Sequence, residues 1–301
     1  MTTGATEQNL ATETPPKFTL VDIGVNLTNP RFNHDQAEVL QRARAAGVDQ
    51  IMITGTCVNS SEQALVLCEQ HADNFPGMLY TTAGVHPHDA KDWKSDTLLR
   101  LRTLAEQPQV VAIGETGLDF NRDYSPRADQ EKVFETQIEL AIECGLPLFL
   151  HERDAHQRQL DILKSYRDQL SEAVIHCFTG TRSELFNYLD LNLHIGITGW
   201  VCDPRRGLEL QGLVKNIPLD RLMIESDAPF LLPKKLLPGG FLPGDNAPKH
   251  QATKKSDKNR NEPAYLPWVL SQLAECRQES EIELARVTTA TARRFFRLKP
   301  S

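Results

Sequence analysis

The chain contains 301 residues, with 33 basic and 40 acidic side chains, so its formal net charge is −7. A hydrophobic share of 40% and a charged share of 24% indicate a globular protein and exclude a disordered or fibrous chain. No apolar run approaches the roughly 18 residues that a membrane-spanning helix needs. The first thirty residues show no secretory signal, and the six cysteines are scattered without a C-x-x-C pair. We therefore expect reduced thiols and a cytoplasmic protein.

Two kinds of segment alternate along the chain after residues 1–17, a polar, threonine-rich stretch that we expect to be a disordered arm. Short apolar runs rich in β-branched residues predict strands that are buried on both faces. These runs lie at residues 18–27, 49–56, 78–86, 110–120, 147–153, 173–180, 192–200 and 221–230. Amphipathic segments of helical length separate them, as at residues 127–144, and a last helix is expected at residues 281–297.

Eight strand–helix units in this length favour a closed (β/α)8 barrel, a TIM barrel, formed by residues 18–298 as a single domain. An open, doubly wound sheet is the alternative. Such a sheet would favour a glycine-rich phosphate loop after its first strand. The sequence there, DIGVNLTNPRF, contains no such loop, so nothing supports nucleotide binding.

Residues 233–260 predict a long loop at the end of the barrel where the strands finish, the face that usually carries function. The acidic balance of the whole chain argues against a general polyanion-binding surface, but this loop reverses the sign. Its basic residues are Lys234, Lys235, Lys249, Lys254, Lys255, Lys258 and Arg260, against Asp245 and Asp257. A solvated flexible loop and an electrostatic guide for a single nucleic-acid strand both remain open.

An ionisable residue ends the apolar beginning of five of the predicted strands. Each strand delivers its terminal side chain to the same mouth of a parallel barrel. The residues are His86, Glu115, His151, His176 and Asp227. Any one of them could be a helix cap or a hydrogen-bonded residue, but burying several such groups unpaired is costly, and a divalent cation relieves that cost.

A mixed set of nitrogen and oxygen donors suits zinc, manganese or a similar ion, whereas magnesium usually prefers oxygen. A cation at this mouth would polarise a phosphoryl or carbonyl oxygen and lower the pKa of a water molecule. A carboxylate that is not needed as a ligand, such as Asp227, could then accept the proton. The residues thus predict metal-assisted hydrolysis, without naming the substrate.

A series of motifs follows in a specific order along the chain. They are DIGVNL (22–27), TAGVHPHD (82–89), AIGETGLDF (112–120), HERDAH (151–156), HCFTG (176–180), GITGWVCDPRRG (196–207), IESDAPFLLP (224–233) and RNEP (260–263). From about residue 20 to 297, this series resembles the TatD family of metal-dependent deoxyribonucleases. The resemblance implies a (β/α)8 barrel and divalent-metal-dependent hydrolysis of phosphodiesters, most specifically as a 3′→5′ exonuclease on single-stranded DNA or RNA.

The resemblance also implies a ligand set, carried over position by position. The family's metal-binding residues match Glu115, His151, His176 and Asp227. Many members carry H-x-H in the first strand, where this chain has Gly24 and Asn26. Because those imidazoles are missing, our hypothesis is one tight site at Glu115, His151 and His176, with a weaker second ion recruited alongside the substrate phosphate. Magnesium is the expected ion in function, with manganese or zinc as alternatives.

Further polar residues are candidates for substrate contact. We assign Asn26, His88, Arg153 and Arg205 to substrate binding, since guanidinium groups pair well with phosphates. His86 is assigned to phosphate contact or proton transfer. Hydrogen bonding within the protein and surface ion pairs are the competing interpretations of these residues.

Three functions remain open at this point: a single-strand exonuclease, a small-molecule hydrolase of the amidohydrolase class such as a lactonase or deacylase, and a nucleic-acid-binding protein with weakened catalysis. The lysine-rich loop favours a phosphodiester substrate. We expect a monomer without membrane contact, and the pathway, whether DNA repair or RNA turnover, stays open.

Overall fold

A computed structural model describes residues 18–234 and 259–299, which form eight parallel strands in one sheet of order β1 to β8. The strands are β1 (Leu20–Val25), β2 (Val48–Ile53), β3 (Leu79–Ala83), β4 (Val110–Asp119), β5 (Leu148–Arg153), β6 (Ala173–Ile175), β7 (His194–Ile197) and β8 (Leu222–Ile224). Each expected strand is confirmed in its expected order. The predicted arm at residues 1–17 and most of the basic loop lie outside the described residues.

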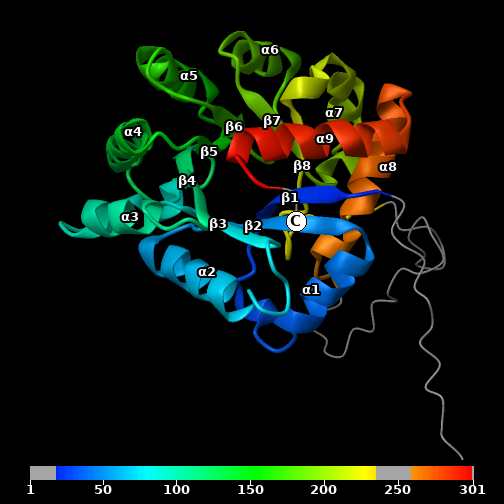
Figure 1. Ribbon diagram of the computed structural model, residues 1–301. Coiled ribbons are helices and arrows are strands. Elements are labelled where there is room, and N and C mark those ends of the chain that lie inside the picture. The colour runs from blue at the N-terminus through cyan, green and yellow to red at the C-terminus, as the bar shows by residue number, and fades with distance from the viewer. Residues whose placement is uncertain (1–17, 235–258, 300–301) are drawn as a thin grey trace, which may run out of the picture.

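Helices follow the strands and surround them (Figure 1). They are α1 (Gln36–Ala45), α2 (Val58–Gln70), α3 (Thr97–Ala105), α4 (Arg127–Cys144), α5 (His156–Tyr166), α6 (Arg182–Asp190), α7 (Leu208–Leu213), α8 (Leu266–Arg277) and α9 (Glu281–Phe296). The helix predicted at residues 127–144 is confirmed as α4. None of the described helices is long and apolar enough to cross a membrane.

The sheet closes where β1 meets the segment after β8. Val25 and Ala228 form a parallel bridge. The backbone amide of Asn26 donates to the carbonyl of Ala228 at 2.7 Å, and the backbone amide of Asp227 donates to the carbonyl of Gly24 at 2.9 Å. The closure brings the two ends of the sheet together. The (β/α)8 barrel is therefore confirmed.

Apolar side chains fill the barrel interior rather than leaving a pore. Residues from successive strands, among them Ile23, Met52 and Phe149, form one buried cluster with Phe295 and Phe296 at the end of α9. Helix α9 packs against β1 and β8 (Figure 1). The interior and α9 therefore close the amino-terminal end of the barrel, and the other end is left for a site.

Candidate metal centre and substrate cavity

A cavity of about 770 Å³ lies at the carboxyl ends of the strands. Eight of the nine predicted site residues line it: Asn26, His86, His88, Glu115, His151, Arg153, His176 and Asp227. The topology explains this gathering, because parallel strands of a barrel all end at one mouth. Arg205, the ninth, is exposed and is not among the lining residues, so its assignment to substrate binding has no support from position.

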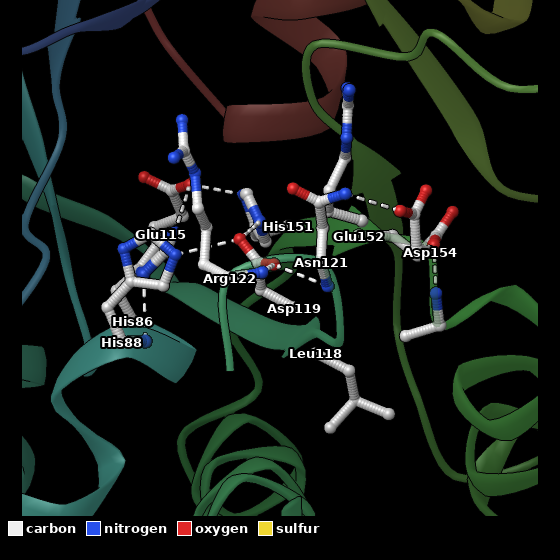
Figure 2. A network of polar contacts seen from close by, with 12 residues as sticks. His86, His88, Glu115, Leu118, Asp119, Asn121, Arg122, His151, Glu152 and Asp154 are labelled. Carbon is white, nitrogen blue, oxygen red and sulfur yellow. Dashed lines mark hydrogen bonds and ion pairs between the residues drawn. The ribbon is translucent and has the colours of Figure 1, made fainter. Parts of the chain in front are cut away.

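The Glu115 carboxylate lies at the centre of a group of imidazoles, three of which face one of its oxygens. Figure 2 shows two of them, His86 and His151, beside Glu115. Its Oε1 atom is 2.8 Å from Nε2 of His176, 3.1 Å from Nδ1 of His151 and 3.3 Å from Nε2 of His86. Glu115 is buried within β4, and His151 belongs to the adjacent strand β5. One carboxylate from the barrel wall thus collects three side chains that the sequence places on three other strand ends.

Asp119 is a second buried carboxylate at this mouth, which the sequence analysis missed. Its Oδ2 atom is 2.7 Å from Nε2 of His88 and 3.3 Å from Nε2 of His151 (Figure 2). The His151 ring therefore lies between Glu115 and Asp119, and each ring nitrogen faces a carboxylate. The sequence signal that could have identified Asp119 is an acidic residue at the end of an apolar strand.

Glu225 is a further residue that the sequence analysis missed. It is fully buried, and its Oε2 atom is 3.4 Å from Nδ1 of His176 while its Oε1 atom accepts a 2.5 Å hydrogen bond from the amide of Cys177. Because Glu225 faces one nitrogen of His176 and Glu115 faces the other, the pair fixes the orientation of the ring. The sequence signal that could have identified Glu225 is a glutamate directly after an apolar run, two residues before Asp227.

The electrostatics of the centre follow from these contacts. Burial alone would raise the pKa of Glu115, but His176 and His86, with a hydrogen bond from His151, hold that pKa well below its ordinary value. Burial alone would lower the pKa of His176, yet Glu115 and Glu225 raise it well above its ordinary value. Burial and the neighbouring His151 lower the pKa of His86 to about 4, so this ring stays neutral.

Asp227 shows the opposite behaviour across the cavity. Burial, together with the charges of Glu225 and Glu115, raises its pKa to about 7, although His176 and a hydrogen bond from Asn26 oppose the shift. In that bond, Nδ2 of Asn26 donates to Oδ1 of Asp227 over 3.0 Å. This excess of buried carboxyl groups favours the binding of a cation.

Gly24, one of the two residues that stand where the first-strand H-x-H motif would place a histidine, lies against Glu225. A Cβ atom at this residue would be 2.4 Å from Oε2 of Glu225 and 3.3 Å from the ring of Phe149. As the barrel is packed here, a side chain larger than glycine requires Glu225 to move. The first strand therefore contributes an amide, Asn26, and no imidazole to the cavity.

Arg153 lines the main cavity, and Trp200 lies beside it in a smaller neighbouring pocket. The guanidinium of Arg153 donates to the hydroxyl of Thr179 at 3.4 Å and lies 5.9 Å from the ring centre of Trp200. The guanidinium of Arg206 lies 4.2 Å from the same ring, whose Nε1 donates to the carbonyl of Arg206. Arg153 thus faces the cavity, whereas Trp200 already has a stacking partner.

The residues fit a divalent cation. Ligand atoms of His86, Glu115 and His151 all lie within 4.8 Å of one another, and this nitrogen and oxygen set suits ions of the zinc and manganese type. Nδ1 of His176 faces Oε2 of Glu225 at 3.4 Å, so Nε2 of His176, which lies 2.8 Å from Glu115, is the nitrogen directed toward this set. Burying several ionisable groups together is costly, and a nearby cation offsets part of that cost.

The fold and the site together define a metal-dependent hydrolase built on a (β/α)8 barrel. The model of the family described as TatD related DNase matches residues 21–297. The chain belongs to this family, and it is therefore a nuclease that hydrolyses phosphodiester bonds of nucleic acid and uses a divalent metal.

Relatives of known name agree with this membership. The chain is 48% identical over 277 residues to the 3′-5′ ssDNA/RNA exonuclease TatD of Enterobacter lignolyticus, covering 92% of this chain and 98% of that protein. It is 47% identical to the protein of the same name from Pectobacterium parmentieri, covering 93% and 100%. Among solved structures, a TatD family hydrolase from Entamoeba histolytica is similar, with 28% identity, a TM-score of 0.81 and coverage of 95% and 100%.

Proposed function

We propose that the chain is a 3′→5′ exonuclease that shortens single-stranded DNA and RNA, with magnesium as the ion in function. The observation that carries the proposal is the buried Glu115 carboxylate with three imidazoles around it in an open cavity. The names of relatives at 47% and 48% identity support the substrate and the polarity.

Glu115, His151, His176 and Asp227 would hold the metal, with His86 as a further ligand of suitable position. A bound cation would supply Lewis-acid polarisation of the phosphoryl oxygen and a lower pKa for the attacking water. Asn26, directly after β1, offers the cavity an amide and no imidazole, so the proposal includes one tight site and a weaker second one. Two equally tight sites in a calorimetric titration without nucleic acid would contradict this.

Asp227 would accept the proton of the reaction, and His86 would contact the phosphate. The Asp227 carboxylate lines the cavity on the side opposite Glu115 and can take a proton from the attacking water. The amide of Asn26 holds the Asp227 carboxylate in place through the 3.0 Å hydrogen bond. The neutral ring of His86 stands beside Glu115 and can donate a hydrogen bond to a phosphate.

Substrate binding would rest on Asn26, His88 and Arg153, which line the cavity. Arg153 contributes a cationic fork suited to a phosphate. Ser125 donates to the carbonyl of His88 at 2.7 Å, and Asp119 fixes the ring, so His88 is held from two sides. For Arg205, an exposed residue outside the lining, the proposal of a backbone contact depends on a strand long enough to leave the cavity.

Cleavage of 5′-labelled single-stranded DNA and RNA in magnesium or manganese tests the proposal. Wild type should produce a ladder shortened from the 3′ end, and Glu115→Ala and His151→Ala should lose this activity. His71→Ala is the matched control, because His71 lies at the end of α2 outside the cavity lining. Intact strands with every metal would refute the nuclease and direct the search to esters and lactones. Cleavage that survives both site substitutions would refute the ligand assignment.

A further inference from the structure

Two aromatic side chains at the rim of the cavity are exposed to solvent. Tyr124 is 55% exposed and Phe230 is 48% exposed, and both line the cavity that holds Glu115. The other large hydrophobic residues that are exposed in the described part of the chain, Val66, Leu99, Phe186, Leu208 and Ile282, do not line it. Exposed aromatic rings thus concentrate at the substrate cavity.

The two rings belong to opposite sides of the mouth. Tyr124 lies in the connection between β4 and α4, and Phe230 lies in the segment after β8. In the order β1 to β8 these strands are four places apart, which in a closed barrel of eight strands is half the circumference. Glu115 stands on the β4 side, and Asp227 on the β8 side. A phosphate at the metal centre would therefore have one aromatic ring on each side.

The backbone is anchored at both residues, so each ring starts from a fixed point on the rim. The carbonyl of Tyr124 accepts a 3.0 Å hydrogen bond from Nζ of Lys91, and its ring meets that of His88 edge to face at 4.7 Å. The amide of Phe230 donates to the carbonyl of Asp227 at 2.9 Å, and Nη1 of Arg31 donates to the carbonyl of Pro229 at 3.1 Å. The Tyr124 ring therefore packs on the ring of His88, and the backbone of Phe230 is held next to Asp227.

We propose that Tyr124 and Phe230 are positioning residues that stack on the two bases flanking the scissile phosphodiester, one base each, and thereby favour unpaired ends. Every nucleobase has a π face, so stacking on aromatic rings binds single strands without sequence preference. In a duplex only the outer face of the terminal base is free, and the penultimate base is covered on both faces, so both rings can be used only by an unpaired end. This inference rests on the proposed exonuclease function.

Base-deletion substrates test the inference. A 5′-labelled oligonucleotide is prepared in three forms: intact, abasic at the 3′-terminal nucleotide, and abasic at the penultimate one. On the intact strand, Tyr124→Ala and Phe230→Ala should each raise KM about tenfold, as expected for the loss of one stacked base, and leave kcat within about twofold. Each variant should also become insensitive to base removal at one position, a different position for each variant.

Controls separate stacking from damage to the fold. Tyr124→Phe and Phe230→Trp keep an aromatic ring and should restore KM and the sensitivity to base removal. Phe186→Ala removes a ring that is 37% exposed on α6 outside the cavity, and it should behave as wild type. An unchanged KM, or wild-type sensitivity of both variants at both positions, would overturn the inference. Loss of sensitivity at the same position in both variants would overturn the arrangement on two sides.

Binding separates this inference from the proposed function. Fluorescence anisotropy of the labelled strands with EDTA measures affinity without cleavage. If wild type binds the intact strand at least about tenfold more tightly than the doubly abasic one and both alanine variants lose this preference, the inference stands even where no strand is cleaved. Equal affinity of wild type for the intact and abasic strands, or no binding at all, would overturn it.

Discussion

Replacement of Asp22 by asparagine should remove a pH-dependent loss of stability. Asp22 lies fully buried in β1, where Oδ1 accepts hydrogen bonds from the amides of Ser226 at 2.8 Å and Gly24 at 3.3 Å. Its Oδ2 atom has no hydrogen-bond partner among the described residues. Burial, with a smaller contribution from the charge of Glu225, raises the pKa of Asp22 from 3.8 to about 8 against the effect of these hydrogen bonds.

The sign and size follow from linkage. Below pH 3.8 the carboxyl is protonated in both states, and between 3.8 and about 8 the unfolded chain releases a proton that the folded chain retains. Stability therefore falls as pH rises through this window, by about 1.4 kcal/mol per pH unit and about 6 kcal/mol in total. The side-chain amide of the Asp22→Asn variant does not titrate and keeps an accepting oxygen, so this contribution disappears.

Urea unfolding at pH 5.5, 6.5 and 7.5 in EDTA measures the effect. The free energy of unfolding of Asp22→Asn minus that of wild type should increase by about 2.7 kcal/mol over these two pH units. Asp73→Asn, at an exposed position, is the control and should show a constant difference. Parallel pH profiles of wild type and Asp22→Asn would refute the reasoning, since they would mean that Asp22 is already ionised in the folded chain.

Three further predictions concern packing, ion pairing and metal. Gly24→Ala places a methyl group 2.4 Å from Oε2 of Glu225 and should lower the free energy of unfolding by about 1–3 kcal/mol in urea titrations. An unchanged urea midpoint would contradict this, because it would mean that Glu225 moves aside without cost. Arg260 is 3% exposed and lies 2.6 Å from both Asp35 and Glu262, and Arg42 also pairs with these two carboxylates. Arg260→Ala should therefore cost about 1.5–3 kcal/mol for the lost charged hydrogen bonds, while Arg42 remains as a partner, and wild-type melting would contradict this. Manganese should raise the melting temperature of wild type but not of Glu115→Gln in calorimetry, and an equal rise in both would exclude Glu115 as a ligand.

The barrel could be predicted because its eight strands are apolar almost throughout, and that pattern follows from burial on both faces. The points where the strands end could not be predicted. The composition of residues 173–180 predicts a long strand, but β6 covers only Ala173–Ile175. The chain leaves the sheet at His176, which turns into the cavity, and Cys177 follows at a φ of 46°. Apolar and β-branched residues continue past that point, so composition alone does not mark where the pairing stops.

The candidate site was predicted where a single residue ends a strand, and missed where two acidic residues share one segment. Glu115 and Asp119 both belong to β4, and only the pairing of Gly117 with His151 shows that the second carboxylate reaches the same imidazole as the first. Glu225 was missed for a related reason. Its partners, His176 and the backbone of Cys177, are more than 45 residues away in sequence, so their contact depends on how β6, β7 and β8 lie side by side.

The closed amino-terminal end of the barrel has a consequence for turnover. Phe295 and Phe296 join the packed interior, so within the described residues the substrate cavity opens only at the carboxyl ends of the strands. A released nucleotide must leave through the opening by which the strand entered. The shortened strand has to withdraw, or its cleaved nucleotide has to pass beside it, before the next phosphodiester can reach Glu115. Each cleavage cycle of such an enzyme therefore includes a clearance step that a barrel with a continuous channel would not need.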